Sequence, residues 1–205
     1  MLMITLFILT TSVAAQRANR VAALDYFPLR VGDSWKYRMI DNDTEYTVKV
    51  LSAEKQLDGT LLYLLEKQAG VIIHDWYSKM NGWVLIHREA YEGQEGLNVK
   101  YQPPKQYLKN PLVAGDKWNW KGKSITQTEM EEHNEVMGVE VVKVPAGTFR
   151  ATKIISRVSD GEAVMQKTYW YADGVGLVKS MTEGGQLKNG WELVDYSFKK
   201  VGAKR

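Results

Sequence analysis

The 205-residue sequence contains no cysteine and only three histidines. The absence of cysteine excludes disulfides, a thiol nucleophile and a lipid anchor attached to a cysteine after the leader. The sequence also lacks Gly-x-Ser-x-Gly, a phosphate-binding loop and His-Glu-x-x-His, the patterns typical of serine hydrolases, P-loop proteins and zinc proteases. These absences argue against an enzyme, and we expect neither catalytic residues nor a cofactor.

A strong excess of one charge is lacking as well. The 27 basic residues nearly balance the 24 acidic ones, which leaves a formal net charge of +3. Small basic clusters occur only near the ends, at Arg17 and Arg20 and at Lys199, Lys200, Lys204 and Arg205. Nucleic-acid-binding proteins usually present a broad basic patch or stripe, so we do not expect nucleic acid as a partner.

Residues 2–15 form an uncharged apolar run that ends in Val13-Ala14-Ala15. Small residues at this point are typical of a signal-peptide cleavage site, although no lysine or arginine precedes the run. The run is shorter than the roughly 20 apolar residues of a membrane span. We predict a signal peptide at 1–15, a short linker at 16–23, one β domain at 24–199 and a basic tail at 200–205, with no transmembrane span after the signal is removed.

These features predict an exported protein, either periplasmic or extracellular. A secreted chain without cysteine is more typical of bacteria than of animals, because secreted animal domains commonly depend on disulfides. We therefore expect a bacterial protein.

One stretch occurs twice, at residues 28–37 and 111–120. Both copies contain Pro-Leu, then Gly-Asp, then a tryptophan with an aromatic residue two positions later, the pattern of a turn that leads into a strand. A second pair, Trp76-Tyr77 and Trp170-Tyr171, supports an internal repeat. We predict two similar halves, 24–102 and 103–199. The break falls at Gln102-Pro103-Pro104-Lys105, because paired prolines are excluded from the inside of a sheet.

Short β-branched and aromatic segments fill most of the remaining sequence. Five Asp-Gly or Asn-Gly pairs, beginning at 58, 81, 160, 173 and 189, are typical of two-residue hairpin turns. We predict strands at 35–40, 46–51, 61–66, 71–77, 83–91, 117–120, 125–130, 139–144, 149–158, 163–171, 176–181 and 191–198, and strand or loop at 127–137. Many strands with tight turns indicate a mainly β protein, either an antiparallel sandwich or a barrel.

Two of the histidines fall in one predicted hairpin. A two-residue turn at its tip places His74 opposite Glu89 and Trp76 opposite His87, all on one side. Imidazole and carboxylate groups can bind a metal, which makes His74, His87 and Glu89 weak candidate ligands. Structural metal sites usually have four ligands, so we favour an ordinary solvated His–Glu pair and expect no metal.

Asp33 and Asp116 are the only acids fixed by the repeat. A pair of facing carboxylates is the arrangement that many glycosidases use. An aspartate that follows glycine also accepts hydrogen bonds from the backbone of its own turn. We favour the turn role, and an uncharacterised hydrolase is only the third interpretation of this chain.

Aromatic side chains are abundant, with seven tryptophans and eleven tyrosines. Packing in the core is the default role of tryptophans on strands. A wide interior would instead leave a cavity for a lipid-like or other hydrophobic ligand, and the sequence does not distinguish the two. The candidate ligand-binding residues are Trp35, Trp76, Trp118, Trp120 and Trp170.

Three motifs stand out along the mature chain: Tyr26-Phe27-Pro28-Leu29 with Gly32 and Trp35, Val144-Pro145-Ala146-Gly147-Thr148-Phe149, and Tyr169-Trp170-Tyr171-Ala172 followed by Gly174-Val175-Gly176-Leu177-Val178-Lys179. Together they resemble the motifs of the TapB-like family, bacterial exported domains of unknown function. The resemblance covers most of the mature chain. It implies an envelope location and a strongly curved antiparallel sheet or half-open barrel, akin to the carriers LolA and LolB but without clear lid helices. It implies no catalytic residues.

The leader, the repeat and the aromatic residues together predict an exported, non-enzymatic bacterial envelope protein. We expect it to bind or carry a hydrophobic small molecule, a lipid or a peptide on an aromatic concave face. The alternative is a structural or assembly protein that contacts other envelope proteins through its strand edges or outer surface.

Overall fold

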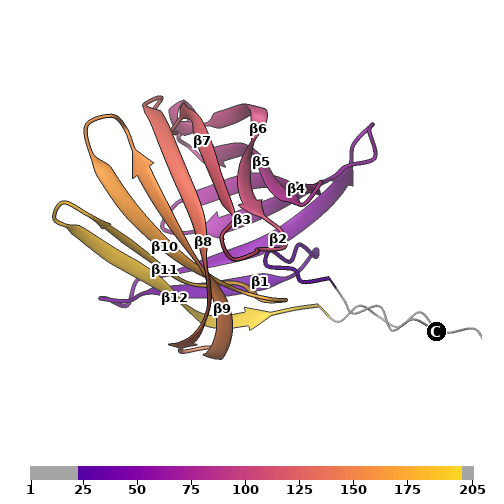
Figure 1. The fold of residues 1–205 in the computed structure, drawn as a ribbon. Helices are drawn as coiled ribbons and strands as arrows, with labels where there is room; N and C mark the ends of the chain where they lie inside the picture. Colours follow the sequence, from indigo (N-terminus) through magenta and orange to yellow (C-terminus); the bar gives the residue numbers. More distant parts are fainter. Residues whose placement is uncertain (1–22, 200–205) are drawn as a thin grey trace, which may run out of the picture.

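The computed structural model describes residues 23–199, so the predicted signal peptide, nearly all of the predicted linker and the basic tail lie outside it. The described chain is almost entirely β-strand (Figure 1). Its strands are β1 (Ser34–Met39), β2 (Glu45–Lys55), β3 (Leu61–Gln68), β4 (Ile72–Met80), β5 (Trp83–Tyr91), β6 (Val99–Lys109), β7 (Lys117–Lys123), β8 (Glu129–Val144), β9 (Gly147–Ser159), β10 (Val164–Ala172), β11 (Gly176–Gly184) and β12 (Leu187–Ser197). A short 3₁₀ helix, η1 (Glu95–Leu97), precedes β6. Within the described range, no helix is long and apolar enough to cross a membrane.

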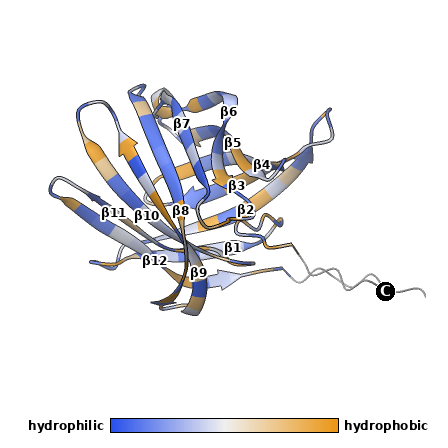
Figure 2. Cartoon of the chain, viewed as in Figure 1, coloured by the Kyte–Doolittle hydropathy of each residue, from blue (hydrophilic) through white to orange (hydrophobic). Residues whose placement is uncertain are grey.

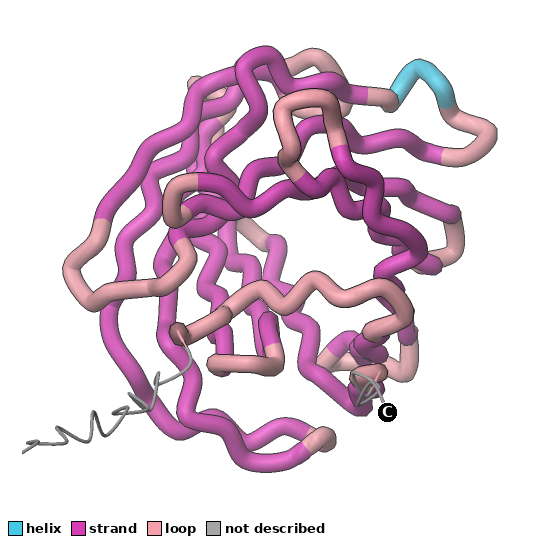
Figure 3. The backbone as a smooth tube through the Cα atoms, turned by 90° about the vertical axis from the view of Figure 1, so that its right-hand side faces the viewer, coloured by secondary structure: helices cyan, strands magenta, loops and turns pink. Residues whose placement is uncertain are grey.

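All twelve strands belong to one antiparallel sheet that curves into a nearly closed barrel (Figures 1 and 3). The strand order is β6-β5-β4-β3-β2-β1-β12-β11-β10-β9-β8-β7. The strands β1 to β6 form one meander and β7 to β12 form another, and the two meanders join through the pairing of β1 with β12. The edge strands β6 and β7 leave one seam unsealed. The prediction of a strongly curved antiparallel sheet or half-open barrel is confirmed.

The two Gly-Asp stretches form the same turn in front of β1 and β7. Gly32 N–H donates to the Val50 carbonyl at 2.8 Å, and Val50 N–H donates back to the Asp33 carbonyl at 2.9 Å. In the second stretch, the Val136 carbonyl accepts from Gly115 N–H at 2.8 Å, and Val136 N–H donates to the Asp116 carbonyl at 2.9 Å. Each turn is therefore hydrogen-bonded to a buried valine of the neighbouring strand, Val50 of β2 or Val136 of β8. The origin of the two halves by duplication, and their boundaries, stay predictions.

The carboxylates of these turns have different partners. Asp33 is fully buried and accepts hydrogen bonds from Arg30 Nε at 2.9 Å and from the backbone N–H of Lys199 at 3.0 Å. Asp116 lies 3.1 Å from Lys109 Nζ, on the other side of the β6–β7 loop. Both carboxylates therefore help to fasten a turn to a neighbouring segment.

Three local predictions are wrong. The Pro103-Pro104 pair does not interrupt the sheet but lies within β6, because an edge strand does not need the N–H groups that proline lacks. Residues 125–130 and 139–144 are not separate strands. Residues 125–128 belong to the loop between β7 and β8, and β8 runs from Glu129 through residues 139–144 with a bulge between Val136 and Gly138. Asn189-Gly190 is not a hairpin turn but lies within β12. A side chain at Gly190 would overlap the Met181 side chain that packs there.

The buried core lines the inner side of the sheet, and hydrophobic and hydrophilic residues alternate along its strands (Figure 2). The segment before β1 closes one end of the barrel. Its residues Tyr26 and Leu29 are buried, and Phe27 packs against Tyr77 at 5.1 Å between ring centroids. Figure 3 shows this loop running from the end of the grey N-terminal trace across the opening. We call residues 24–33 the cap segment.

Candidate ligand-binding interior

Two adjoining cavities lie inside the curved sheet. The first, about 130 Å³, reaches the cap segment and is called the cap cavity. The second, about 230 Å³, reaches the strands that flank the seam and is called the seam cavity. The cap cavity is lined by Phe27, Pro28, Trp35, Tyr37, Tyr46, Val48, Leu65, Lys67, Tyr77, Tyr107, Tyr171, Gly176 and Leu177. The seam cavity is lined by Lys105, Tyr107, Leu108, Trp118, Glu132, Asn134, Ile154, Ser156, Lys167, Tyr169 and Tyr171. Tyr107 and Tyr171 line both cavities and separate them.

Tyrosine, rather than tryptophan, is the main aromatic residue of this interior. Tyr37 and Tyr46 stack with ring centroids 4.9 Å apart, and the Tyr77 and Tyr107 rings meet edge to face at 5.4 Å. Burial raises the pKa of Tyr37, Tyr77 and Tyr171, so these phenols remain neutral hydrogen-bond donors. A tyrosine wall offers both apolar ring faces and hydroxyl groups to a bound molecule.

A buried ion pair lies beside the cap cavity. Lys67 Nζ is 2.5 Å from Oδ2 of Asp75, whose side chain is fully buried. The geometry gives an ion pair without a good hydrogen bond, and neither carboxylate oxygen of Asp75 is hydrogen-bonded within the described chain. Burial is the largest single influence and lowers the pKa of Lys67, but the interactions with Asp75, Tyr107 and Glu89 together outweigh it, so the net shift is upward. Lys67 therefore remains charged.

A second carboxylate lies beside Asp75 on the adjacent strand. Glu89 on β5 pairs with Asp75 on β4, and its carboxylate accepts a hydrogen bond from the Tyr101 hydroxyl at 2.9 Å. Burial is the main cause that raises the pKa of Glu89, and the charge of Asp75 adds to it. Burial and the repulsion between the Asp75 and Glu89 charges outweigh the nearby Lys67 and Lys105, which favours the protonated form of Glu89.

The seam cavity contains a further ion pair and a free lysine. Lys105 Nζ lies 2.5 Å from Glu132 Oε1 and 4.0 Å from the centre of the Trp120 ring. Lys167, on β10, lines the same cavity, and no carboxylate of the described chain lies within ion-pair distance of it. The buried Nε1 of Trp118 also lacks a hydrogen-bond partner there. A hydrogen-bond acceptor with negative charge would satisfy both groups.

The five tryptophans predicted as ligand-binding residues divide between the two faces of the sheet. Trp35 lines the cap cavity, where its Nε1 donates to the Val175 carbonyl at 2.6 Å. Trp118 lines the seam cavity and packs against Trp83 at 5.9 Å. Trp120 lies at the seam, with its ring 5.9 Å from that of Tyr101.

Trp76 and Trp170 were predicted on the concave face and do not line the cavities. Arg88 lies 4.7 Å above the Trp76 ring, while Lys153 and Lys179 lie 5.5 and 5.6 Å from the Trp170 ring. The neighbouring tyrosine of each tryptophan points inward instead, because successive side chains on a strand face opposite sides. The Trp-Tyr repeat contained this signal, but it did not say which of the two aromatic residues lies inside.

The predicted His74–Glu89 and Trp76–His87 pairings are wrong. The two-residue turn forms, with positive φ angles of 52° at Asn81 and 77° at Gly82, but β5 carries an extra residue between the partners of Trp76 and Tyr77. The bulge shifts the register, so that His74 pairs with Ala90 and Trp76 with Arg88. Glu89 consequently faces Asp75 in the interior.

The histidines have local partners instead. His74 Nε2 lies 3.4 Å from Glu66 Oε2, and His87 Nε2 shares a 2.8 Å hydrogen bond with the Ser78 hydroxyl. Burial lowers the pKa of His87. Among residues 23–199, no three histidine, aspartate or glutamate side chains gather as metal ligands.

The comparisons with known proteins agree with this fold. A DUF3108-like family model matches residues 95–188, which contain the Val144–Phe149 and Tyr169–Lys179 motifs. No curated protein matches the sequence. Two solved structures share the architecture. One, from Bacteroides fragilis, is named as an exported protein with a YmcC-like fold, and the other, from Parabacteroides distasonis, is named as a lipoprotein.

The similarity to these two structures extends along the chain although sequence identity is low. The Bacteroides structure has a TM-score of 0.54 at 16% identity and covers 86% of this chain and 100% of its own. The Parabacteroides structure has a TM-score of 0.50 at 17% identity and covers 85% of this chain and 99% of its own. The predicted TapB-like and LolA relationships stay predictions. The chain is thus similar to a DUF3108-like family from η1 to the start of β12, and it has the fold of the YmcC-like exported protein.

Proposed function

We propose that this chain is an exported envelope protein that binds a small amphipathic anion in its interior, without catalysing a reaction on it. Export is supported by the signal-like residues 2–15 and by the names of the two proteins that share the fold. The binding role rests on one observation above all. Two adjoining cavities are lined by tyrosines, and Lys167 in the seam cavity has no carboxylate partner in the described chain.

The two cavities suit different parts of one molecule. Aromatic and aliphatic side chains such as Phe27, Trp35 and Leu65 would hold an apolar group in the cap cavity. Lys167 and the unpartnered Nε1 of Trp118 would hold an anionic group in the seam cavity. Drug-sized ligands usually occupy about 300–1,000 Å³. Each cavity alone is smaller, so the ligand is a small molecule that spans both and displaces Tyr107 or Tyr171.

The first experiment identifies a natural ligand. Protein purified from its own envelope is examined by native mass spectrometry, and the interior is then probed by displacement of a fluorescent hydrophobic dye with decanoate. A bound mass and displacement of the dye are expected. A bare mass, together with no displacement by decanoate, would contradict an interior binding site.

A matched pair of variants tests the role of the lysine. Lys167→Gln removes the charge inside the seam cavity, whereas Lys153→Gln removes a charge beside Trp170, on the opposite face. We expect Lys167→Gln to weaken decanoate binding about tenfold, which corresponds to about 1.4 kcal/mol, and Lys153→Gln to leave it unchanged. Decanol, which has no charge, is expected to bind both variants like the wild type. Equal loss of decanoate affinity in the two variants would argue for a general charge effect.

A further inference from the structure

A groove of about 840 Å³ runs along the unsealed seam between β6 and β7. It is separate from the two interior cavities and is lined chiefly by residues 98–104, Gln106 and residues 119–123. Both of its sides are edges of the sheet, and edge strands present unpaired N–H and C=O groups. The groove therefore combines a hollow surface with free backbone groups.

Side chains bridge the seam near the loop that joins its two strands. Lys109 on β6 lies 3.1 Å from Asp116, and Trp83 on β5 packs against Trp118 on β7. Further along, Lys105 reaches Glu132 on β8. The groove continues from this point toward Lys100 and Lys123, at the ends of β6 and β7 that lie away from the loop. Side-chain contacts thus connect the two sides of the seam, while the backbone edges of β6 and β7 stay unpaired with each other.

The two edges differ in what they offer to another strand. Pro103 and Pro104 lack N–H groups and lie in β6, which makes that edge a poor partner. The edge strand β7 has the sequence Lys-Trp-Asn-Trp-Lys-Gly-Lys and contains no proline. Alternate backbone groups of β7 point away from β8 and are free to form a new antiparallel or parallel ladder. An added strand would therefore pair with β7.

The charge of the groove selects among possible strands. Its lining includes Lys100, Lys121 and Lys123 and contains no aspartate or glutamate. Lys121 lies 2.6 Å from Glu131, whereas Lys100 and Lys123 are in none of the ion pairs of the described chain. Lysines on an edge disfavour apolar or basic strands, but they attract an acidic one.

We propose that this groove binds an extended acidic segment of another polypeptide, which adds a strand to β7. Free backbone groups favour a peptide, since addition of a strand to a sheet edge is a recurring mode of peptide recognition. An anionic polysaccharide would need an open aromatic face for its sugar rings. The largest aromatic side chain of the groove, Trp120, has Lys105 4.0 Å above its ring and the Tyr101 ring packed against it. The peptide is thus the better match.

The test uses a synthetic eight-residue peptide of alternating glutamate and threonine, with three comparison ligands. These are the same peptide with lysine in place of glutamate, the glutamate peptide with N-methylated amides, and polygalacturonate. We expect the glutamate peptide to bind, and the lysine and N-methylated peptides to bind at least about tenfold more weakly, a difference of about 1.4 kcal/mol. Hydrogen exchange should slow at amides of 117–123 and remain unchanged at 99–109.

Matched variants locate the charge effect. Lys100→Gln combined with Lys123→Gln should weaken binding of the glutamate peptide about tenfold or more. Lys55→Gln combined with Lys143→Gln removes two exposed strand lysines elsewhere and should not change it. Equal binding of the N-methylated peptide, or no binding of the glutamate peptide at millimolar concentration, would overturn strand addition. Tighter binding of polygalacturonate, lost in the first double variant, would assign the groove to an anionic polysaccharide instead.

Discussion

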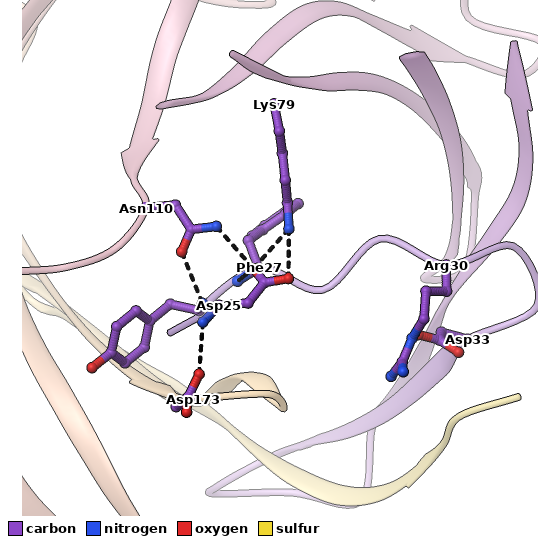
Figure 4. Close-up of polar contacts among 8 residues, drawn as sticks. Asp25, Phe27, Arg30, Asp33, Lys79, Asn110 and Asp173 are labelled. Atoms are coloured by element: carbon purple, nitrogen blue, oxygen red, sulfur yellow. Dashed lines mark hydrogen bonds and ion pairs between the residues drawn. The ribbon is translucent and has the colours of Figure 1, made fainter. Parts of the chain in front are cut away.

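Lys79 Nζ lies 2.7 Å from both carboxylate oxygens of Asp25, and this contact ties the cap segment to the end of β4. Asn110, in the β6–β7 loop, donates to the same carboxylate at 2.8 Å, and the backbone N–H of Asp25 donates to Asp173 at 2.6 Å (Figure 4). A single residue of the cap segment is therefore connected to hairpins of both meanders. This arrangement holds the loop that covers the cap cavity.

Replacement of Asp25 should loosen the cap. Asp25→Asn removes the charged acceptor of Lys79, and because Asp25 is 39% exposed we expect a loss of only about 1 kcal/mol in the free energy of unfolding near pH 7. Urea denaturation measures this loss. Asp41→Asn, in an exposed turn, is the matched control and should be neutral.

The same network predicts a pH dependence. Burial alone would raise the pKa of Asp25, but Lys79 and Asn110 outweigh it and leave the pKa below its ordinary value. The stabilisation is therefore complete above the ordinary aspartate pKa of about 3.9 and is lost as the pH falls through the folded-state value. The difference between wild type and Asp25→Asn should shrink at about pH 3. An undiminished difference there would show that the carboxylate charge is not the cause.

Removal of one partner of the buried Lys67–Asp75 ion pair should strongly destabilise the protein, whereas replacement of both partners by apolar residues should change its stability little. Asp75→Asn leaves Lys67 without its counter-charge, and we expect a loss of about 3 kcal/mol in urea denaturation. The double variant Lys67→Met with Asp75→Leu removes both charges and should lie within about 1 kcal/mol of the wild type. Similar losses in the single and double variants would mean that packing, rather than charge, determines stability here.

Glu89 should make the protein less stable as the pH rises. Its pKa is raised in the folded state, so its contribution to stability is complete below the ordinary glutamate pKa of about 4.3 and is lost as the pH rises through the folded-state value. Glu89→Gln retains an oxygen acceptor for the Tyr101 hydroxyl but does not titrate. Thermal unfolding should show the variant to be more stable than the wild type at about pH 8 and similar to it at about pH 4. A variant that is less stable at both pH values would contradict this account.

Trp35, which lines the cap cavity, and Trp170, on the outer face of the sheet, should respond differently to substitution. Trp35→Phe leaves the Val175 carbonyl without its donor in a partly buried position, and we expect a loss of about 2 kcal/mol. Trp170→Phe retains an aromatic ring for the lysines on the outer face and should cost less than about 1 kcal/mol. Denaturant midpoints and slopes of both variants provide the comparison. Equal losses would place the two tryptophans in similar environments.

Local sequence patterns predicted the architecture because hairpin turns, and the alternation of inward and outward side chains along a strand, depend only on residues that are close in sequence. Asn81-Gly82 forms the expected turn, and residues 83–91 form the expected strand. Position in the sheet is not a local property, which is why the prolines of β6 were interpreted as a break. The edge location of that strand depends on where the sheet ends.

The site was harder to predict than the fold for a related reason. Alternation assigns Trp76 and Tyr77 to opposite faces but does not determine which face is enclosed. Because β5 contains one extra residue, Glu89 does not pair with His74 as predicted but pairs with Asp75, on the buried side. The lysines of the interior gave no sequence signal, because lysine on a strand is usually exposed.

The pairing of β1 with β12 has a consequence for biosynthesis. Trp35 lies opposite Tyr196, so the two meanders join through residues that are synthesised far apart in time. During vectorial emergence of the chain, one edge of β1 has no partner until the final hairpin has been made. Contacts between such distant residues slow folding, and an unpaired strand edge invites association between chains. The join between the two meanders therefore depends on a strand from the end of the described chain.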